Sequence, residues 1–262
     1  MIENNRFRSS QPRQAPERYQ QPKKKIIKKT IKILLLILTF TNGFSQKTEL
    51  KICLNSGLFS FSGESAEANS QFNLFSNSNS GYTNNPYGTK SGFSYGISLN
   101  LQRVNKVNLI IGVNSGFQAN KSKIAINSVF GNDGTNTYQK SVTGKTFLIN
   151  NSLFVNPFIG YRFDINKIPI DIVGGLNFEY ILSTKEIGNA KDLNNVEYST
   201  SIDRKTINID VSPKIQLSTE FKKFGLILGY STGLVNYKQG YVGVTNNVYS
   251  RNINFGITYK LK

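Results

Sequence analysis

The feature that most constrains the fold of this chain is an alternation of apolar and polar residues at period two, repeated in stretches of about ten residues or more. Successive side chains of a β-strand point to opposite faces, so this alternation predicts strands with one apolar and one polar face. The last stretch shows it plainly, with one face formed by Ile253, Phe255, Ile257, Tyr259 and Leu261 and the other by Asn252, Asn254, Gly256, Thr258 and Lys260.

Eight strands are predicted in this way: Leu50–Phe61, Gly92–Gln102, Val107–Gln118, Phe147–Phe163, Pro169–Leu182, Ile207–Phe221, Phe224–Tyr237 and Asn252–Leu261. The connections between them are short and long by turns. The short ones are Arg103–Lys106, Asp164–Lys167 and Lys222–Lys223, which suit hairpin turns. The long ones are Gly63–Ser91, Asn120–Thr146, Ser183–Lys205 and Lys238–Val248. They are rich in Ser, Asn, Gly and Lys, so we expect mobile, solvent-exposed loops.

Because short and long connections alternate strictly, all the short turns lie at one end of the predicted molecule. Together with strands longer than the usual five or six residues, this layout predicts an all-β fold, an eight-stranded antiparallel up-and-down transmembrane β-barrel. The Gly, Asn and Ser of the polar face would fill a narrow lumen, and ring closure leaves no unpaired edge in lipid. A soluble barrel shares the alternation and is the alternative.

Aromatic residues of the apolar face favour the membrane barrel, because they gather near the two ends of the strands, as membrane interfaces prefer. Near the long connections lie Phe93, Tyr95, Phe117, Phe147, Phe178, Tyr180 and Tyr249. Near the short turns lie Tyr161, Phe163, Phe221, Phe224 and Tyr259. If these residues served only as strand formers, they would be scattered along the strands.

The first 45 residues differ from the rest and read as a signal peptide with a long basic n-region. The basic run Lys23–Lys32 precedes the apolar run Ile33–Phe40, and the small residues of Thr41–Ser45 follow. Cleavage is expected after Ser45, and the apolar run is far shorter than the roughly 20 residues of a membrane anchor. This leader carries +8 of the net charge of +17. Residues 46–262 form the predicted outer-membrane β-barrel domain.

Two segments extend the prediction to a family. The strand Asn156–Phe163 has the order Pro, then Gly-Tyr-Arg, and the chain ends in the strand Phe255–Lys262. Both resemble the small outer-membrane β-barrel domain proteins of Gram-negative bacteria, with the OmpA-like transmembrane barrel as archetype and PorT-type barrels of type IX secretion among the relatives. The resemblance implies assembly by the barrel-assembly machinery. The chain departs from the family's terminal signal by ending in Leu-Lys instead of an aromatic residue.

Ionisable residues on the polar face are expected to form a paired network in the lumen, because buried charges need partners. They are Lys51, Arg162, Asp171, Glu179, Asp210, Lys214, Glu220 and Lys260. A catalytic or ion-conducting group is the alternative. The chain has no His, no G-x-S-x-G element and no D-x-D-x-D array, so no enzyme, cofactor or metal site is expected. Cys53 is expected to fill space in the lumen, and Pro157 and Pro213 to mark bulges on outward positions.

The sequence therefore predicts a non-enzymatic outer-membrane protein with a structural, surface-binding or adhesion role, carried by four long extracellular loops. A porin for small solutes or ions, or an accessory component of a secretion apparatus, are the alternatives. The expected partners are outer-membrane lipid, the barrel-assembly machinery and an extracellular or envelope partner. No nucleic acid is expected, because residues 46–262 carry 22 Lys/Arg against 13 Asp/Glu with no basic stripe interleaved with aromatic residues.

Overall fold

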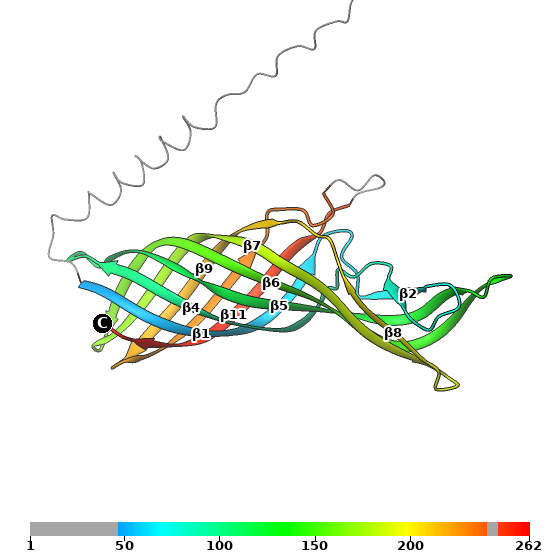
Figure 1. The fold of residues 1–262 in the computed structure, drawn as a ribbon. Coiled ribbons are helices and arrows are strands. Elements are labelled where there is room, and N and C mark those ends of the chain that lie inside the picture. Colours follow the sequence, from blue (N-terminus) through cyan, green and yellow to red (C-terminus); the bar gives the residue numbers. More distant parts are fainter. Residues whose placement is uncertain (1–46, 240–245) are drawn as a thin grey trace, which may run out of the picture. The chain divides into compact units, whose positions relative to one another are not determined.

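The computed structural model describes residues 47–239 and 246–262 (Figure 1). The strands are β1 (Lys47–Ser62), β2 (Asn69–Leu74), β3 (Gly81–Thr83), β4 (Lys90–Val104), β5 (Leu109–Asn132), β6 (Thr137–Ile165), β7 (Ile168–Asp192), β8 (Glu197–Asp203), β9 (Ile209–Phe221), β10 (Phe224–Thr232) and β11 (Tyr249–Lys260). No helix in these two ranges is long and apolar enough to cross a membrane. The predicted signal peptide lies outside the described residues.

Eight of these strands close into a ring: β1, β4, β5, β6, β7, β9, β10 and β11. Each is antiparallel to both of its neighbours, and the first and last strands of the chain complete the ring over the register Lys51↔Lys260 to Ser62↔Tyr249. The all-β, eight-stranded, up-and-down barrel predicted from the alternation is confirmed.

The tight turns owe their shape to Asn and Lys. In the β6–β7 turn, Asn166 and Lys167 both have positive φ, 51° and 71°, as in the type I′ turn that matches the twist of a hairpin. In the β4–β5 turn, the Asn105 side-chain oxygen accepts hydrogen bonds from the backbone N–H groups of Val107 and Leu109, at 3.0 and 2.8 Å. Val107 was predicted to begin the next strand, but this Asn turn holds it outside β5.

The two faces of the ring differ as the alternation predicts. The outside carries large apolar side chains that are about half exposed, such as Leu54 at 60% and Ile97 at 52%. The inside carries small and polar side chains, such as Ser98 and Asn114, that are almost fully buried. Cys53 is completely buried among them, as expected of a small filler.

Two of the four predicted loops, 120–146 and 183–205, are largely regular sheet, and a third, 63–91, contains two short strands, so the prediction of loops without regular structure is wrong there. β5 and β6 continue as a paired hairpin as far as Asn132↔Thr137, through most of the segment predicted as a loop. The segment 63–91 contains β2 and β3, and the segment 183–205 contains the end of β7 and all of β8. The inward positions of the hairpin include Ile124, Ile126 and Val129, whose spacing is interrupted by a bulge between Ile126 and Ser128. This bulge shifts the period by one residue and hides the strand from a period-two reading.

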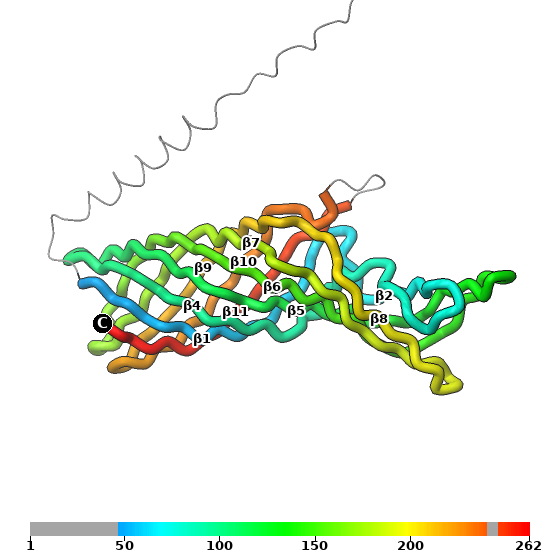
Figure 2. The backbone as a smooth tube through the Cα atoms, viewed as in Figure 1, coloured from blue at the N-terminus to red at the C-terminus, as the bar shows by residue number. Residues whose placement is uncertain are grey.

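These strands form a lobe, which we define as residues 63–91, 121–147 and 184–208. Three of the ring strands, β5, β6 and β7, run without a break from the barrel into the lobe (Figure 2). Its sheet has the order β3-β2-β5-β6-β7-β8, with β2 parallel to β5. β8 also meets the residues just before β3, because the Ser199 N–H donates to the Asn79 carbonyl oxygen at 3.0 Å. The lobe has its own buried core of Phe72, Ile124, Ile126, Val129, Val142, Ala190 and Tyr198.

Two further expectations are corrected. The register of β6 on β7 is the same on both sides of Pro157, and that of β7 on β9 is unbroken at Pro213, so neither proline marks a bulge. Both side chains are on outward positions, where the missing N–H removes one ladder bond without shifting the strand. In addition, β10 ends at Thr232 and not at Tyr237, because the chain turns inward and buries Tyr237.

Candidate functional site

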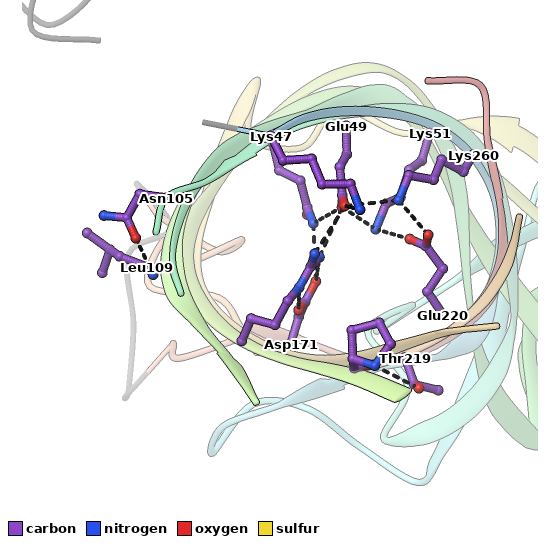
Figure 3. A network of polar contacts seen from close by, with 12 residues as sticks. Lys47, Glu49, Lys51, Asn105, Leu109, Asp171, Thr219, Glu220 and Lys260 are labelled. Atoms are coloured by element: carbon purple, nitrogen blue, oxygen red, sulfur yellow. Dashed lines mark hydrogen bonds and ion pairs between the residues drawn. The ribbon is translucent and has the colours of Figure 1, made fainter. Parts of the chain in front are cut away.

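An ionic cluster fills the lumen near the short turns, and Glu49 is its centre (Figure 3). The Glu49 carboxylate is completely buried and accepts hydrogen bonds from both terminal nitrogens of Arg162, at 3.1 and 3.0 Å. Arg162 also donates to Asp171, with its Nε at 2.6 Å from Oδ1. The Gln102 amide bridges the two carboxylates, at 2.9 Å from Glu49 and 3.1 Å from Asp171. Such two-pronged guanidinium pairing fixes geometry as well as charge.

Two lysines join this group to a third carboxylate. Lys260 Nζ lies 2.9 Å from Glu49 and 2.6 Å from Glu220, and Lys51 Nζ lies 3.2 Å and 2.9 Å from the same two residues. The buried ionic cluster is therefore Glu49, Lys51, Arg162, Asp171, Glu220 and Lys260, with three positive and three negative charges. The largely exposed Lys47 also lies 3.3 Å from Glu49, at the rim of this cluster. Because each buried charge faces an opposite one, the six buried side chains form a paired network across the lumen.

A second polar layer lies further along the lumen. Glu179 and Asp210 are register partners on β7 and β9. Glu179 accepts from Asn177 at 2.7 Å, whereas Asp210 accepts from the Ser250 hydroxyl at 2.6 Å. Lys214 borders a cavity of only about 20 Å³ in this layer, which is enough for a water molecule or two and not for a substrate.

An aromatic plug closes the lumen where the barrel meets the lobe. Phe61 packs edge-to-face against Phe59, Tyr87 and Tyr237, with ring centroids 4.9 to 5.1 Å apart. The plug is the buried cluster Phe59, Phe61, Tyr87, Leu148, Ile181, Tyr237 and Val248. Residues from five separate segments of the chain meet there, so the lumen is apolar and filled at this level.

The lobe is joined at its base by one buried ion pair. Glu186 is completely buried, and Arg204 Nε donates to its carboxylate at 2.6 Å. The same carboxylate accepts from the Thr83 backbone N–H and the Thr200 hydroxyl, both at 2.7 Å, and Arg204 donates in turn to the Thr83 carbonyl oxygen. This pair therefore ties β3, β7 and β8 together.

The tip of the lobe is held by Asp192, in the β7–β8 turn. Desolvation acts to raise the pKa of this carboxyl, but hydrogen bonds outweigh it and the pKa is lowered. The donors are the backbone N–H groups of Val196 and Asn194, each at 2.9 Å, and the Tyr198 hydroxyl at 3.2 Å. The turn is thus built around a carboxylate that stays ionised at neutral pH.

The structure divides the predicted lumen network into two groups. It brings Arg162, Asp171 and Glu220 together with Lys51 and Lys260. Glu179, Asp210 and Lys214 lie in the second polar layer, and Lys214 forms no ion pair within 4 Å with any described residue.

Sequence reasoning missed Glu49 and Glu186, the two fully buried glutamates. Glu49 stood one residue before the predicted first strand, although continuing the alternation of Lys51 and Cys53 backwards would have placed it inside the barrel. Glu186 was assigned to a loop, so no inward position was available for it.

The predicted aromatic belts lie on the outer face. At the short-turn end, Tyr161 and Phe163 are in contact with ring centroids 5.0 Å apart, and Phe224 and Tyr259 at 5.3 Å, with Phe221 directly opposite Phe224. At the other end, the outward positions include Phe93, Tyr95, Phe117, Phe178, Tyr180 and Tyr249. Phe147 is the outlier, because it lies six residues beyond Leu153 on β6, in the lobe.

Within residues 47–239 and 246–262, no three His, Cys, Asp or Glu side chains are grouped so that they could hold a metal ion. The lumen carboxylates face lysine, arginine, amide and hydroxyl groups instead. The arrangement therefore offers charge pairing and closure rather than an open coordination site.

Comparison with known proteins yields no matching family model and no matching curated protein sequence. Among solved structures, the chain is similar to neisserial surface protein A, at 13% identity over 82% of this chain and 99% of that chain, with a TM-score of 0.34. It is also similar to Ail, the attachment invasion locus protein of Yersinia pestis, at 8% identity over 84% and 100%, with a TM-score of 0.27. A third similarity is to the translocator domain of the autotransporter NalP from Neisseria meningitidis, at 10% identity over 90% and 95%, with a TM-score of 0.21. The fold of the present chain rests on its own closed ring of strands.

Proposed function

We propose that this chain is an outer-membrane barrel that neither catalyses a reaction nor conducts solutes, and that binds a partner at the cell surface through its lobe. The observation that carries this proposal is a contrast within the molecule. The barrel interior is filled by the ionic cluster and the aromatic plug, whereas the chain beyond the barrel forms a sheet with a core of its own. A rigid, exposed structure of this kind is suited to recognition.

Membrane insertion is supported by the outer face of the ring. Soluble proteins rarely expose a contiguous apolar patch larger than a few hundred Å². Here, half-exposed Leu, Ile, Val and aromatic side chains surround the barrel, among them Leu54, Leu99, Ile111, Ile159, Leu226 and Ile257. Lipid is the environment in which such a surface is stable, and the short turns at one end and the lobe at the other match the layout of an outer-membrane barrel.

The filled lumen supports a role that involves neither catalysis nor conduction. A substrate or a hydrated ion would need a path past the plug, where Phe61 and Tyr237 are 1% and 3% exposed. The two cavities lined mainly by lumen residues measure about 20 and 10 Å³. The carboxylates that could act as acids or bases lie beneath that seal, and those of the ionic cluster are held in ion pairs.

A trimmed barrel tests the binding role. Because Lys123 faces Phe147, and Lys185 faces Asp203, each hairpin can be cut at these pairs and rejoined with Asn-Gly, which suits a two-residue turn. We expect the trimmed chain to fractionate with outer membranes and to keep a heat-modifiable gel mobility. Cells that display it should lose the attachment to protein-coated surfaces that the full chain confers. Equal attachment by both chains would refute a role for the lobe.

A further inference from the structure

The outer face of the lobe carries a lysine patch where it adjoins the barrel. The patch consists of Lys90, Lys121, Lys123, Lys145 and Lys185, arranged around Phe147. Two of its lysines contact the ring directly: Lys121 Nζ lies 5.0 Å and Lys145 Nζ 5.6 Å from the Phe147 centroid. A cation over an aromatic face is held by the ring's quadrupole, so these ammonium groups are gathered around one side chain.

The strand register places all five lysines on one face. Lys123 is directly opposite Phe147 on β6 and Lys90 on β4, and directly opposite residues share a face. Lys121 and Lys145 lie two residues from those positions, and Lys185 lies two residues from Ile187, the partner of Phe147 on β7. The neighbours of Lys123 along the chain, Ser122 and Ile124, are completely buried, so this face points outward.

The patch is not neutralised by the protein. Among the described residues, none of its five lysines forms an ion pair within 4 Å. Asp203, opposite Lys185 in the register, is the acidic residue paired with this face, while the next acidic side chain along β8, Glu197, is bound to Lys191 at 2.7 Å. Glu67, whose backbone is bridged to Gly88 two residues before Lys90, is a second carboxylate beside the patch, so five lysines against two carboxylates leave a net charge of +3. Such a concentration of charge attracts anions.

The position of the patch along the strands indicates which kind of anion it binds. One row across the sheet, Phe117, Leu153 and Tyr180, is apolar and belongs to the outer surface of the barrel. Lys121 and Lys185 lie one on each side of Ile149, four residues further along β6. At about 3.3 Å per residue and a tilt of about 40°, this is roughly 10 Å further along the membrane normal. The headgroup layer, about 5 to 8 Å thick, begins where the hydrocarbon ends. Lysine side chains can bend back towards it.

We propose that the lysine patch binds the phosphate groups of a phosphorylated lipid in the leaflet on the lobe side of the membrane. Phe147 holds Lys121 and Lys145 close together, and the apolar row beneath them accommodates the acyl chains. The inference rests on the proposed membrane placement. It adds a lipid-headgroup site that also fixes the depth of the barrel in the bilayer.

Lipid titration of charge-matched variants tests the proposal. The patch variant is Lys121→Gln/Lys123→Gln/Lys145→Gln. The control, Lys106→Gln/Lys140→Gln/Lys191→Gln, removes the same charge away from Phe147. The full mature chain and both variants are folded in a zwitterionic detergent and titrated with diphosphoryl lipid A or its dephosphorylated form. Each lysine near a membrane contributes about a fivefold factor to anionic-lipid binding. We therefore expect the patch variant to bind at least about fivefold more weakly than the control, the factor of Lys121, which lies nearest the headgroup layer, because Lys123 and Lys145 lie roughly 15 and 20 Å beyond the apolar row.

Removal of the lipid phosphates should abolish the difference between the two variants. Equal binding of diphosphoryl lipid A by the patch variant and the control would overturn the proposal. Preferential binding of heparin by the unmodified chain would also overturn it, because the patch would then be a site for soluble polyanions. If the chain were not a membrane protein at all, the result would be different from these outcomes. The unmodified chain would then neither acquire a heat-modifiable mobility in detergent nor enter vesicles.

Discussion

Glu49 is a fully buried carboxylate that forms ion pairs with one arginine, Arg162, and with three lysines, Lys47, Lys51 and Lys260. Glu49→Gln keeps the shape of the side chain but leaves the ionic cluster with an excess positive charge. Removing one partner of a buried ion pair costs about 3–5 kcal/mol. We expect a fall of this size in the free energy of unfolding, measured by urea titration in lipid vesicles. The chain has no Trp, so far-UV circular dichroism and gel mobility are the suitable signals.

The matched control is Glu197→Gln. The Glu197 side chain also pairs with a lysine, at 2.7 Å, but the two side chains are 71% and 57% exposed. Exposed pairs contribute little to stability, because water screens the two charges. If both variants lost the same stability, the ionic cluster would not have the role in stability that its burial implies.

Arg204 holds the lobe through the planar shape of its guanidinium group, which binds Glu186 and the Thr83 carbonyl oxygen at the same time. The ammonium of lysine cannot reproduce this fork. Arg204→Lys should weaken the lobe by about 2 kcal/mol, the range of a hydrogen bond to a charged group. Limited chymotrypsin digestion of the folded protein should then cut the lobe faster and leave the barrel intact. Arg251→Lys, an exposed position on β11, should change nothing.

Single residues also show which contacts can be predicted from the sequence and which cannot. Arg162, Asp171 and Glu220 were predicted to share the lumen because they fall on the inward positions of long alternating strands. Which of these side chains contact each other depends on how far neighbouring strands are shifted along one another around the ring. This shift is set when the barrel closes, and the sequence of a single strand does not specify it. For this reason Glu179 and Asp210 were predicted in the same network, although they lie in a separate layer.

At the scale of elements, the lobe is a folded unit and Phe72 is the residue that tests it. Phe72, on β2, is completely buried in the core of the lobe. Phe72→Ala should destabilise the lobe by about 3–5 kcal/mol, as for other buried Phe-to-Ala changes. Hydrogen exchange should show loss of protection in residues 121–147, with protection of the barrel strands retained. Phe75→Ala, which alters a 49% exposed ring three residues after Phe72, serves as the control. Unchanged protection in the Phe72 variant would contradict a packed lobe.

The strands of the lobe could not be predicted from the sequence, and the reason is physical. Segments rich in Ser, Asn, Gly and Lys are typical of loops, and the strands of the lobe have that composition on their outward faces. Their stability comes from a few inward side chains such as Ile124, Tyr198 and Phe72, brought together from three connections that are distant in the sequence. A parallel pairing such as β2 on β5 leaves no local pattern at all. The barrel strands were predictable because each one carries its own alternation.

The whole molecule has two seals in series, and this arrangement leads to the last prediction. The ionic cluster closes the lumen near the short turns, and the aromatic plug closes it near the lobe. Because either seal alone blocks a path, the refolded chain should show no stable conductance steps in planar bilayers. Removing one seal, by Phe61→Ser/Tyr87→Ser or by Glu49→Ala/Arg162→Ala, should leave the bilayer silent.

Only the four substitutions together should admit ions, as brief and irregular events, since the second polar layer still narrows the lumen around its cavity of about 20 Å³. Heat-modifiable mobility of each variant shows that the barrel is still folded when the current is recorded. Stable open steps in the unmodified chain would contradict both seals and would revive the porin alternative. Conductance steps in a variant that lacks only one seal would instead show that this seal alone closes the lumen. A barrel that conducts no current would leave the lobe as the part of the molecule that binds a partner.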